Sequence, residues 1–84
     1  MAHSTKYTQS AKKELNALSG DLQKRIVKAV KKLKDNPRPA DCKKLKERDA
    51  YRVRVGDYRI IYEIYDNVLI VLVIKVAHRR EVYR

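Results

Sequence analysis

The sequence predicts an α+β fold: a short N-terminal strand, a two-helix hairpin, then an antiparallel meander of three strands. In the first half of the chain, apolar residues recur three and four positions apart, which is typical of amphipathic helices. In the second half they alternate with polar residues, as in strands with one buried face. Two turn signals, Gly56-Asp57 and Asp66-Asn67, divide that half into three strands. The 84 residues, 1–84, are expected to form a single domain with one modest core.

Alternation at the N-terminus predicts the first strand, in which polar residues separate His3, Thr5 and Tyr7. A first helix is expected to begin at Ser10, as its N-cap, and to stop at Gly20. Its apolar stripe consists of Ala11, Leu15 and Leu18.

The second helix is expected to have one apolar and one basic face. Asp21 is its predicted N-cap, and Asn36-Pro37 ends it. Residues at helical spacing form the apolar stripe: Leu22, Ile26, Ala29, Val30 and Leu33. The opposite face carries five cations: Lys24, Arg25, Lys28, Lys31 and Lys32. This pattern predicts a helix that packs on the sheet with its lysines in solvent.

The three strands are expected at roughly Leu45–Val55, Tyr58–Tyr65 and Leu69–Val76. A type II′ turn at Gly56-Asp57 would set Arg54 directly opposite Arg59. Tyr51, Val53 and Val55 then share the buried face with Tyr58, Ile60 and Tyr62, and the three arginines of the hairpin share the other, Arg52, Arg54 and Arg59. Like charges that face each other across two strands destabilise a sheet by up to ~1 kcal/mol. The pattern therefore indicates either repulsion tolerated in water or a negatively charged partner on this face.

The register of the last strand decides where Lys75 lies. The segment is apolar on both faces, and a shift of one residue turns every side chain over. A two-residue turn would bury Lys75, whereas a three-residue turn, with Asn67 or Val68 as the odd residue, would place it beside Arg59. We expect the second, because a buried unpaired lysine is costly. The basic surface would then be bordered by three apolar residues, Ile61, Val71 and Val73.

The composition points to a polyanionic partner. The chain has 21 basic and 10 acidic residues, a formal net charge of +11. It has no apolar run of about 18 residues and no secretory signal pattern, so no membrane association is expected. Cys42 is the only cysteine, which fits a reducing cytoplasm. No metal or other cofactor is expected, since His3 and His78 lie at opposite ends of the chain and no metal-ligand spacing occurs.

The C-terminal tail is expected to return to the arginines of the hairpin. An antiparallel last strand would bring to one site seven side chains: Arg52, Arg54, Arg59, Lys75, His78, Arg79 and Tyr83. Guanidinium groups bind phosphate oxygens through forked hydrogen bonds and stabilise the extra charge of a pentacovalent phosphorus. Tyrosine stacks on unpaired bases, and histidine transfers protons near neutral pH. These residue types together suit RNA cleavage.

The sequence resembles the RelE-type toxins of bacterial and archaeal toxin–antitoxin systems, within the RelE/ParE superfamily. The resemblance spans nearly the whole chain, through "AKKEL", "NPRP", "LKERDAYRVRVGDYRIIYEI" and "HRREVYR". It implies the RelE-like microbial ribonuclease fold and a metal-independent endoribonuclease that cuts mRNA in the ribosomal A site. It further implies an acidic, RelB-like antitoxin that holds the toxin inactive in a hetero-oligomer.

The resemblance also implies roles for individual residues. Arg52 and Arg54 match a basic pair on the second strand of the family, Arg59 the arginine of its "YR" motif, and Arg79 and Tyr83 residues of its C-terminal segment. In the family these residues orient the 2′-hydroxyl, stabilise the transition state and assist the leaving 5′-oxygen.

The general base is the role that this sequence leaves open. The strand-two pair is often lysine in the family, whereas an arginine essentially never gives up its proton. His78 is the first candidate by chemistry and Tyr83 the second, while Glu63 lies on the same face but farther from the turn. RNA contacts are expected from four further cations: Lys75, Arg80, Lys28 and Lys32. Two alternatives remain: a ParE-like inhibitor of DNA gyrase on the same fold, and a basic module that binds RNA without cutting it.

Overall fold

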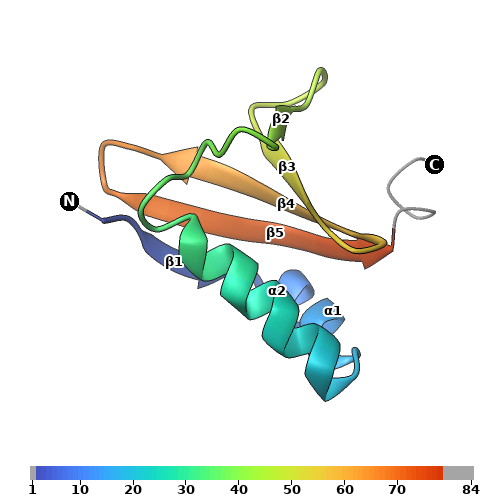
Figure 1. Cartoon of the computed structure of the whole chain (residues 1–84). Helices are drawn as coiled ribbons and strands as arrows, with labels where there is room; N and C mark the ends of the chain where they lie inside the picture. Colours follow the sequence, from blue (N-terminus) through green and yellow to red (C-terminus); the bar gives the residue numbers. More distant parts are fainter. Residues whose placement is uncertain (1, 79–84) are drawn as a thin grey trace.

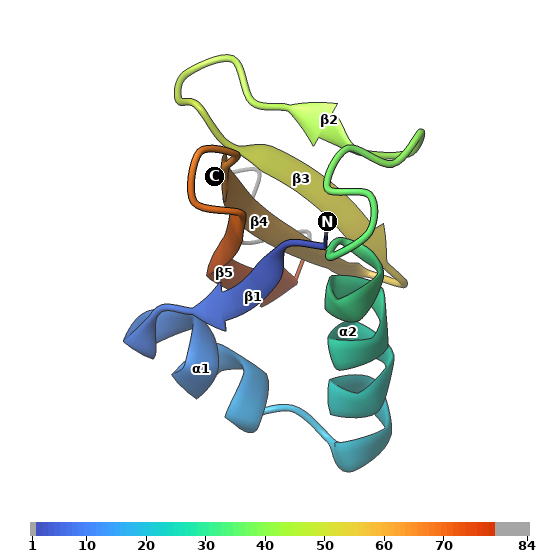
Figure 2. The same ribbon diagram turned by 90° about the vertical axis from the view of Figure 1, so that its left-hand side faces the viewer.

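In the computed structural model, which describes residues 2–78, two helices cover one face of a five-stranded sheet (Figure 1 and Figure 2). The strands lie in the order β1-β5-β4-β3-β2. The elements are β1 (Ser4–Tyr7), α1 (Gln9–Asn16), α2 (Gly20–Lys32), β2 (Lys43–Lys44), β3 (Tyr51–Val55), β4 (Tyr58–Tyr65) and β5 (Ile70–His78). The predicted α+β architecture is therefore confirmed, with β1 as a parallel neighbour of β5. Neither described helix is long and apolar enough to cross a membrane.

Both helices begin at a different cap from the one predicted. The Thr8 hydroxyl accepts a hydrogen bond from the Ala11 amide at 3.1 Å, so the cap of α1 lies two residues before the expected one and Ser10 lies inside the helix. The Ser19 hydroxyl accepts from the Leu22 amide at 3.4 Å. Gly20, the predicted stop of the first helix, is thus the first residue of α2. In both helices, a hydroxyl two residues before the predicted cap accepts a hydrogen bond from an amide of the first turn that has no partner within the helix.

Only the last part of the predicted strand Leu45–Val55 is a strand, β3, and β2 lies just before the predicted start. The short strand β2 pairs antiparallel with the start of β3, Lys43 with Arg52 and Lys44 with Tyr51. A turn separates them, closed by the Leu45 amide on the Ala50 carbonyl at 2.9 Å. The intervening "KERD" is exposed throughout, since four consecutive polar residues cannot alternate into a core. Within residues 2–78, no strand therefore covers the outer edge of β3 beyond Arg52.

The β3–β4 hairpin has the predicted register. Gly56 has a φ of +59°, in the left-handed region that glycine adopts without strain, and Asp57 does not share it. This is the φ pattern of the type II′ turn expected at this position. Val55 pairs with Tyr58 and Arg54 with Arg59, so the two arginines are cross-strand neighbours, as predicted.

The register between β4 and β5 is set by a bulge within the strand. The connecting loop has four residues, 66–69, and not the predicted two or three. Tyr62 pairs with Val73 but Ile61 pairs with Lys75, so Ile74 is an extra residue in β5. The odd residue expected in the turn therefore lies in the strand.

The position of the bulge changes which side chains share a face. Lys75 lies on the same face as Arg59, as predicted, because the bulge precedes it. Val71 and Val73 precede the bulge, so they turn toward the helices and are fully buried. Their predicted place at the border of the basic surface is wrong.

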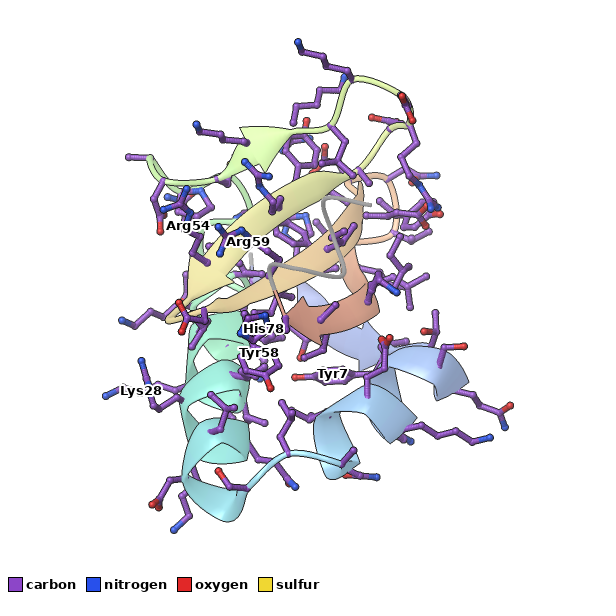
Figure 3. All side chains as sticks on the ribbon, turned by 90° about the vertical axis from the view of Figure 1, so that its right-hand side faces the viewer. Tyr7, Lys28, Arg54, Tyr58, Arg59 and His78 are labelled. Atoms are coloured by element: carbon purple, nitrogen blue, oxygen red, sulfur yellow. The ribbon has the colours of Figure 1, made fainter. Side chains whose placement is uncertain are left out.

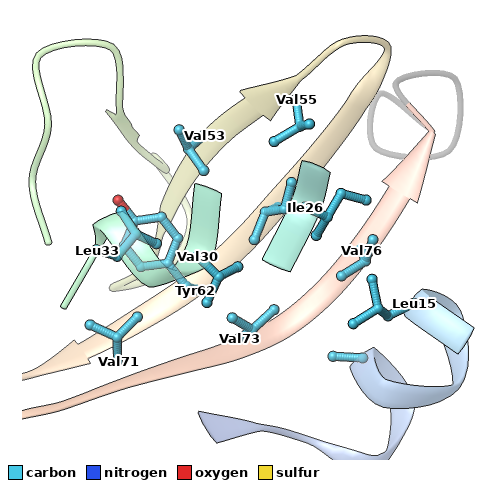
Figure 4. Packing of buried hydrophobic residues seen from close by; sticks show 12 residues of the cluster. Leu15, Ile26, Val30, Leu33, Val53, Val55, Tyr62, Val71, Val73 and Val76 are labelled. Carbon is cyan, nitrogen blue, oxygen red and sulfur yellow. The ribbon is translucent and has the colours of Figure 1, made fainter. Parts of the chain in front are cut away.

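The core lies between the helices and the inner face of the sheet (Figure 4). Tyr62 is its largest fully buried side chain, and its hydroxyl donates to the Pro37 carbonyl at 2.8 Å. Burial raises the pKa of the Tyr62 hydroxyl, which keeps the donor protonated. The segment that follows α2 is thereby attached to the centre of the sheet. Tyr51 stacks on Tyr62 at 6.0 Å between ring centroids, and Arg38 lies over Tyr51.

We expect Tyr62→Phe to lower the free energy of unfolding by ~1–2 kcal/mol, because the Pro37 carbonyl would lose its buried donor. Urea denaturation measures the change. Tyr65→Phe is the matched control: its hydroxyl also makes one hydrogen bond, to Glu63, but the ring is 43% exposed, so we expect less than ~0.5 kcal/mol. Equal effects of the two substitutions would contradict this role of the Tyr62 hydroxyl.

Candidate functional site

Four cations share the face of the sheet that the helices leave open. Figure 3 labels two of them, Arg54 and Arg59. We call this surface the arginine face and define it as Arg52, Arg54, Arg59 and Lys75. Arg54 pairs across the strands with Arg59. In the next row, Ile61 lies between Arg52 and Lys75, one strand from each. Because adjacent strands are about 4.8 Å apart, the Cα atoms of each row span no more than about 10 Å, a scale that suits an RNA backbone.

Burial differs strongly between the two facing arginines. Arg54 is exposed, whereas only 3% of the surface of Arg59 is accessible. Arg54 therefore presents its charge to solvent, and Arg59 lies deeper in the site. The predicted acid of this face, Glu63, accepts from Arg48 at 3.0 Å and lies two residues from the bulge. Glu63 therefore forms an ion pair with Arg48.

His78 does not join the arginine face. It pairs with Tyr58, on the helix-covered side, and the two rings meet edge to face at 5.4 Å. The residue of β5 opposite Arg59 is Ala77. The reason is that β5 continues to His78, two residues past its predicted end, so alternation persists and His78 points away from the arginines (Figure 3). The expected convergence of His78 with the arginines is thus corrected.

The other predicted site residues fall into three groups. Arg79, Arg80 and Tyr83 lie outside the described residues. Lys28 points outward from α2, away from the sheet (Figure 3). Lys32 lines a groove that Arg54 also lines. Among residues 2–78, no three His, Cys, Asp or Glu side chains come together in a way that could hold a metal ion.

The comparisons with known proteins identify the family. A family model described as the ParE toxin of type II toxin–antitoxin systems matches residues 5–83. A RelE-like toxin protein of Escherichia coli is 31% identical over 81 residues, covering 94% of this chain and 85% of its own. The chain belongs to the RelE/ParE toxin superfamily. It is a RelE-type toxin of a type II toxin–antitoxin system.

Solved structures agree with this family. The RelE–RelB complex of Pyrococcus horikoshii contains a chain with a TM-score of 0.83 and 28% identity, covering 94% of this toxin and 97% of that chain. The isolated RelE toxin of Escherichia coli has a TM-score of 0.81 and 28% identity, covering 98% and 92%. The predicted RelE-like fold is therefore confirmed over nearly the whole toxin.

Glu14 is a site residue that the sequence did not reveal. Pairing of β1 with β5 ends at Val73, and beyond that point α1 replaces β1 beside the edge of β5. One carboxylate oxygen of Glu14 accepts from the Val76 amide at 2.9 Å, and the other lies 3.5 Å from the Lys75 ammonium. Glu14 therefore provides a hydrogen-bond acceptor for an amide at the edge of β5, and it restrains a cation of the arginine face. The only signal in the sequence was its place beside buried Leu15, at the border of the helix stripe.

Removal of one of the facing guanidinium groups should stabilise the toxin. We expect Arg54→Gln to raise the free energy of unfolding by up to ~1 kcal/mol, because a like-charge pair is relieved. Lys12→Gln, on the exposed side of α1, removes the same charge elsewhere and controls for the lower net charge. Urea denaturation at low salt compares them. A less stable Arg54→Gln protein would show that this guanidinium supports the fold.

Substitutions of Glu14 should separate its two contacts. Glu14→Ala removes the acceptor of the Val76 amide, so we expect a loss of ~1–2 kcal/mol and faster hydrogen exchange at that amide. Glu14→Gln keeps an acceptor oxygen and should preserve most of the protection while it loses the ion pair with Lys75. Unchanged Val76 exchange in Glu14→Ala would rule out this capping role.

Proposed function

We propose that the toxin is a ribosome-dependent endoribonuclease that cuts mRNA without a metal ion. The observation that supports it most directly is the cross-strand pair of Arg54 and Arg59, with Arg52 and Lys75 in the adjacent row. This arrangement works against stability, so a function that needs concentrated positive charge is its simplest explanation. Cleavage of RNA is the activity that the resemblance to RelE-type toxins implies.

The proposed reaction begins with the ribose 2′-hydroxyl next to the scissile phosphate. Its oxygen forms a bond to phosphorus, the bond from phosphorus to the 5′-oxygen breaks, and the products are a 2′,3′-cyclic phosphate and a 5′-hydroxyl end. The proton leaves the 2′-oxygen for a base, and a proton is delivered to the 5′-oxygen. Arg52 and Arg54 would hold the phosphate oxygens, and Arg59, being buried, would act where charges interact more strongly.

The proton acceptor is the least determined role. Arginine cannot fill it, and His78 lies on the other face of the sheet from Arg59. Tyr83 therefore becomes the first candidate, and Arg79 is proposed as a further phosphate ligand, as the family pattern implies. Lys75, Arg80, Lys28 and Lys32 are proposed contacts to mRNA or ribosomal RNA, since each is a cation that can bind a phosphate group.

The proposed partners follow from charge and from the solved relatives. Structures such as the Pyrococcus horikoshii complex contain a RelE toxin bound to RelB. With a net charge of +11, this toxin would bind an acidic RelB-like antitoxin in a hetero-oligomer. When released, it would act on mRNA in the A site of ribosomes in the cytoplasm.

Inhibition of DNA gyrase is the second candidate function, because the family model that matches this chain is described as the ParE toxin. Purified toxin, mRNA-programmed ribosomes and a gyrase supercoiling assay distinguish the two. We expect cuts in ribosome-bound mRNA, little cutting of free mRNA and active gyrase. Arg54→Gln should slow single-turnover cleavage by ~10²-fold, and Lys12→Gln should cut at the wild-type rate. Intact mRNA with inhibited gyrase would favour ParE-like action, and RNA bound but never cut would favour a binding module.

A further inference from the structure

A groove of about 410 Å³ lies between the second half of α2, the segment 36–41 and the edge of β3. It has an apolar floor, formed by Leu33 and Val53, which are 2% and 6% exposed. Exposed Lys32 and Arg54 line it as cations. The volume falls within the range of small-ligand pockets, about 300–1,000 Å³.

This groove continues onto the arginine face. A second hollow, of about 320 Å³, is lined by Arg52, Arg54, Lys43 and Asp41. Arg54 and Asp41 also line the groove, so the two depressions meet at the outer edge of β3. In the part of the chain that the structure describes, β2 pairs with that edge only at Tyr51 and Arg52. A single chain of linked nucleotides can therefore pass from one depression to the other.

We propose that the groove binds one unpaired nucleotide of the RNA, next to the phosphate held on the arginine face. Lys32 and Arg54 would bind its phosphate, and the base would lie on Leu33 and Val53. This inference rests on the proposed ribonuclease function and extends it to a binding site for a flanking nucleotide.

Polar groups of the segment 36–41 give the groove a base preference. The Asn36 side-chain oxygen already accepts from the Arg38 amide at 3.2 Å, which leaves its amide nitrogen as a donor. Asp41 adds a carboxylate, which accepts hydrogen bonds from exocyclic amino groups. The groove should therefore prefer adenine, cytosine or guanine to uracil, which has no amino group.

An acidic peptide fits the same groove less well than RNA does. Within residues 2–78, the outer edge of β3 lacks a neighbouring strand only at Val53–Val55, which is short for strand addition. Asp41 would also repel a carboxylate-rich segment, whereas it favours the N–H donors of a base.

The test uses ribosomes programmed with mRNA that carries a 2′-deoxyribose at the attacking position, so that binding is measured without cleavage. A photoactivatable 6-thioguanosine is placed in turn at each nucleotide near the scissile phosphate. We expect one flanking position to cross-link to the segment 36–41. Lys32→Glu should weaken that cross-link about tenfold. Lys31→Glu makes the same charge change one residue away, outside the groove, and should leave the cross-link within about threefold.

A second measurement addresses the base preference. Asp41→Ala should reduce the ratio of cleavage rates between amino-bearing bases and uracil at that position by several-fold, on the order of one hydrogen bond. The ratio is insensitive to the overall gain in RNA affinity that loss of a carboxylate brings. An unchanged ratio would overturn the assigned role of Asp41.

The outcomes separate this inference from the proposed function. If mRNA is cut, cross-links form only to other segments, and Lys32→Glu and Lys31→Glu have equal effects, then nucleotide binding in the groove is overturned while the proposed nuclease activity stands. A cross-link in the groove without cleavage of natural mRNA would keep the groove and reject the nuclease. Loss of antitoxin binding in Lys32→Glu with unchanged cross-linking would assign the groove to the antitoxin and overturn the proposal.

Discussion

The β-bulge at Ile74 determines which side of the sheet each half of β5 serves. Before it, Val71 and Val73 face the helices and complete the core. After it, Lys75 lies beside the arginines. A regular strand with the same loop would exchange the faces of Lys75 and Val76, placing a lysine in the core. The extra residue thus reconciles a buried first half with a cationic second half.

Two further contacts keep this arrangement in place. Glu14 binds the Val76 amide and Lys75 where β1 no longer covers β5, so α1 stabilises the segment that follows the bulge. Tyr62 binds the Pro37 carbonyl from the centre of β4, which fixes the segment leading to the groove beside β3. Packing on one face therefore supports a concentration of charge on the other, and that charge is the part of the structure that stability alone does not explain.

The hairpin of β3 and β4 could be predicted from the sequence because glycine chemistry at Gly56 fixes its turn, and with it the facing pair Arg54 and Arg59. The bulge could not, since β5 is apolar on both sides and an odd residue in the turn or in the strand puts Lys75 on the same face. The extension of β5 by two residues to His78 was not predicted, for the same reason. The position of that histidine was therefore predicted wrongly. Glu14 acts through a backbone amide, and such contacts leave no pattern in a sequence.

The central claim is that the arginine face cuts mRNA on the ribosome. Mapping of mRNA 5′ ends in cells, after induction of the wild-type toxin or of a protein with both Arg52→Gln and Arg54→Gln, tests it most directly. We expect new 5′-hydroxyl ends within translated regions for the wild type only, before any change in DNA supercoiling. Unchanged mRNA ends during growth arrest by the wild-type toxin would contradict it.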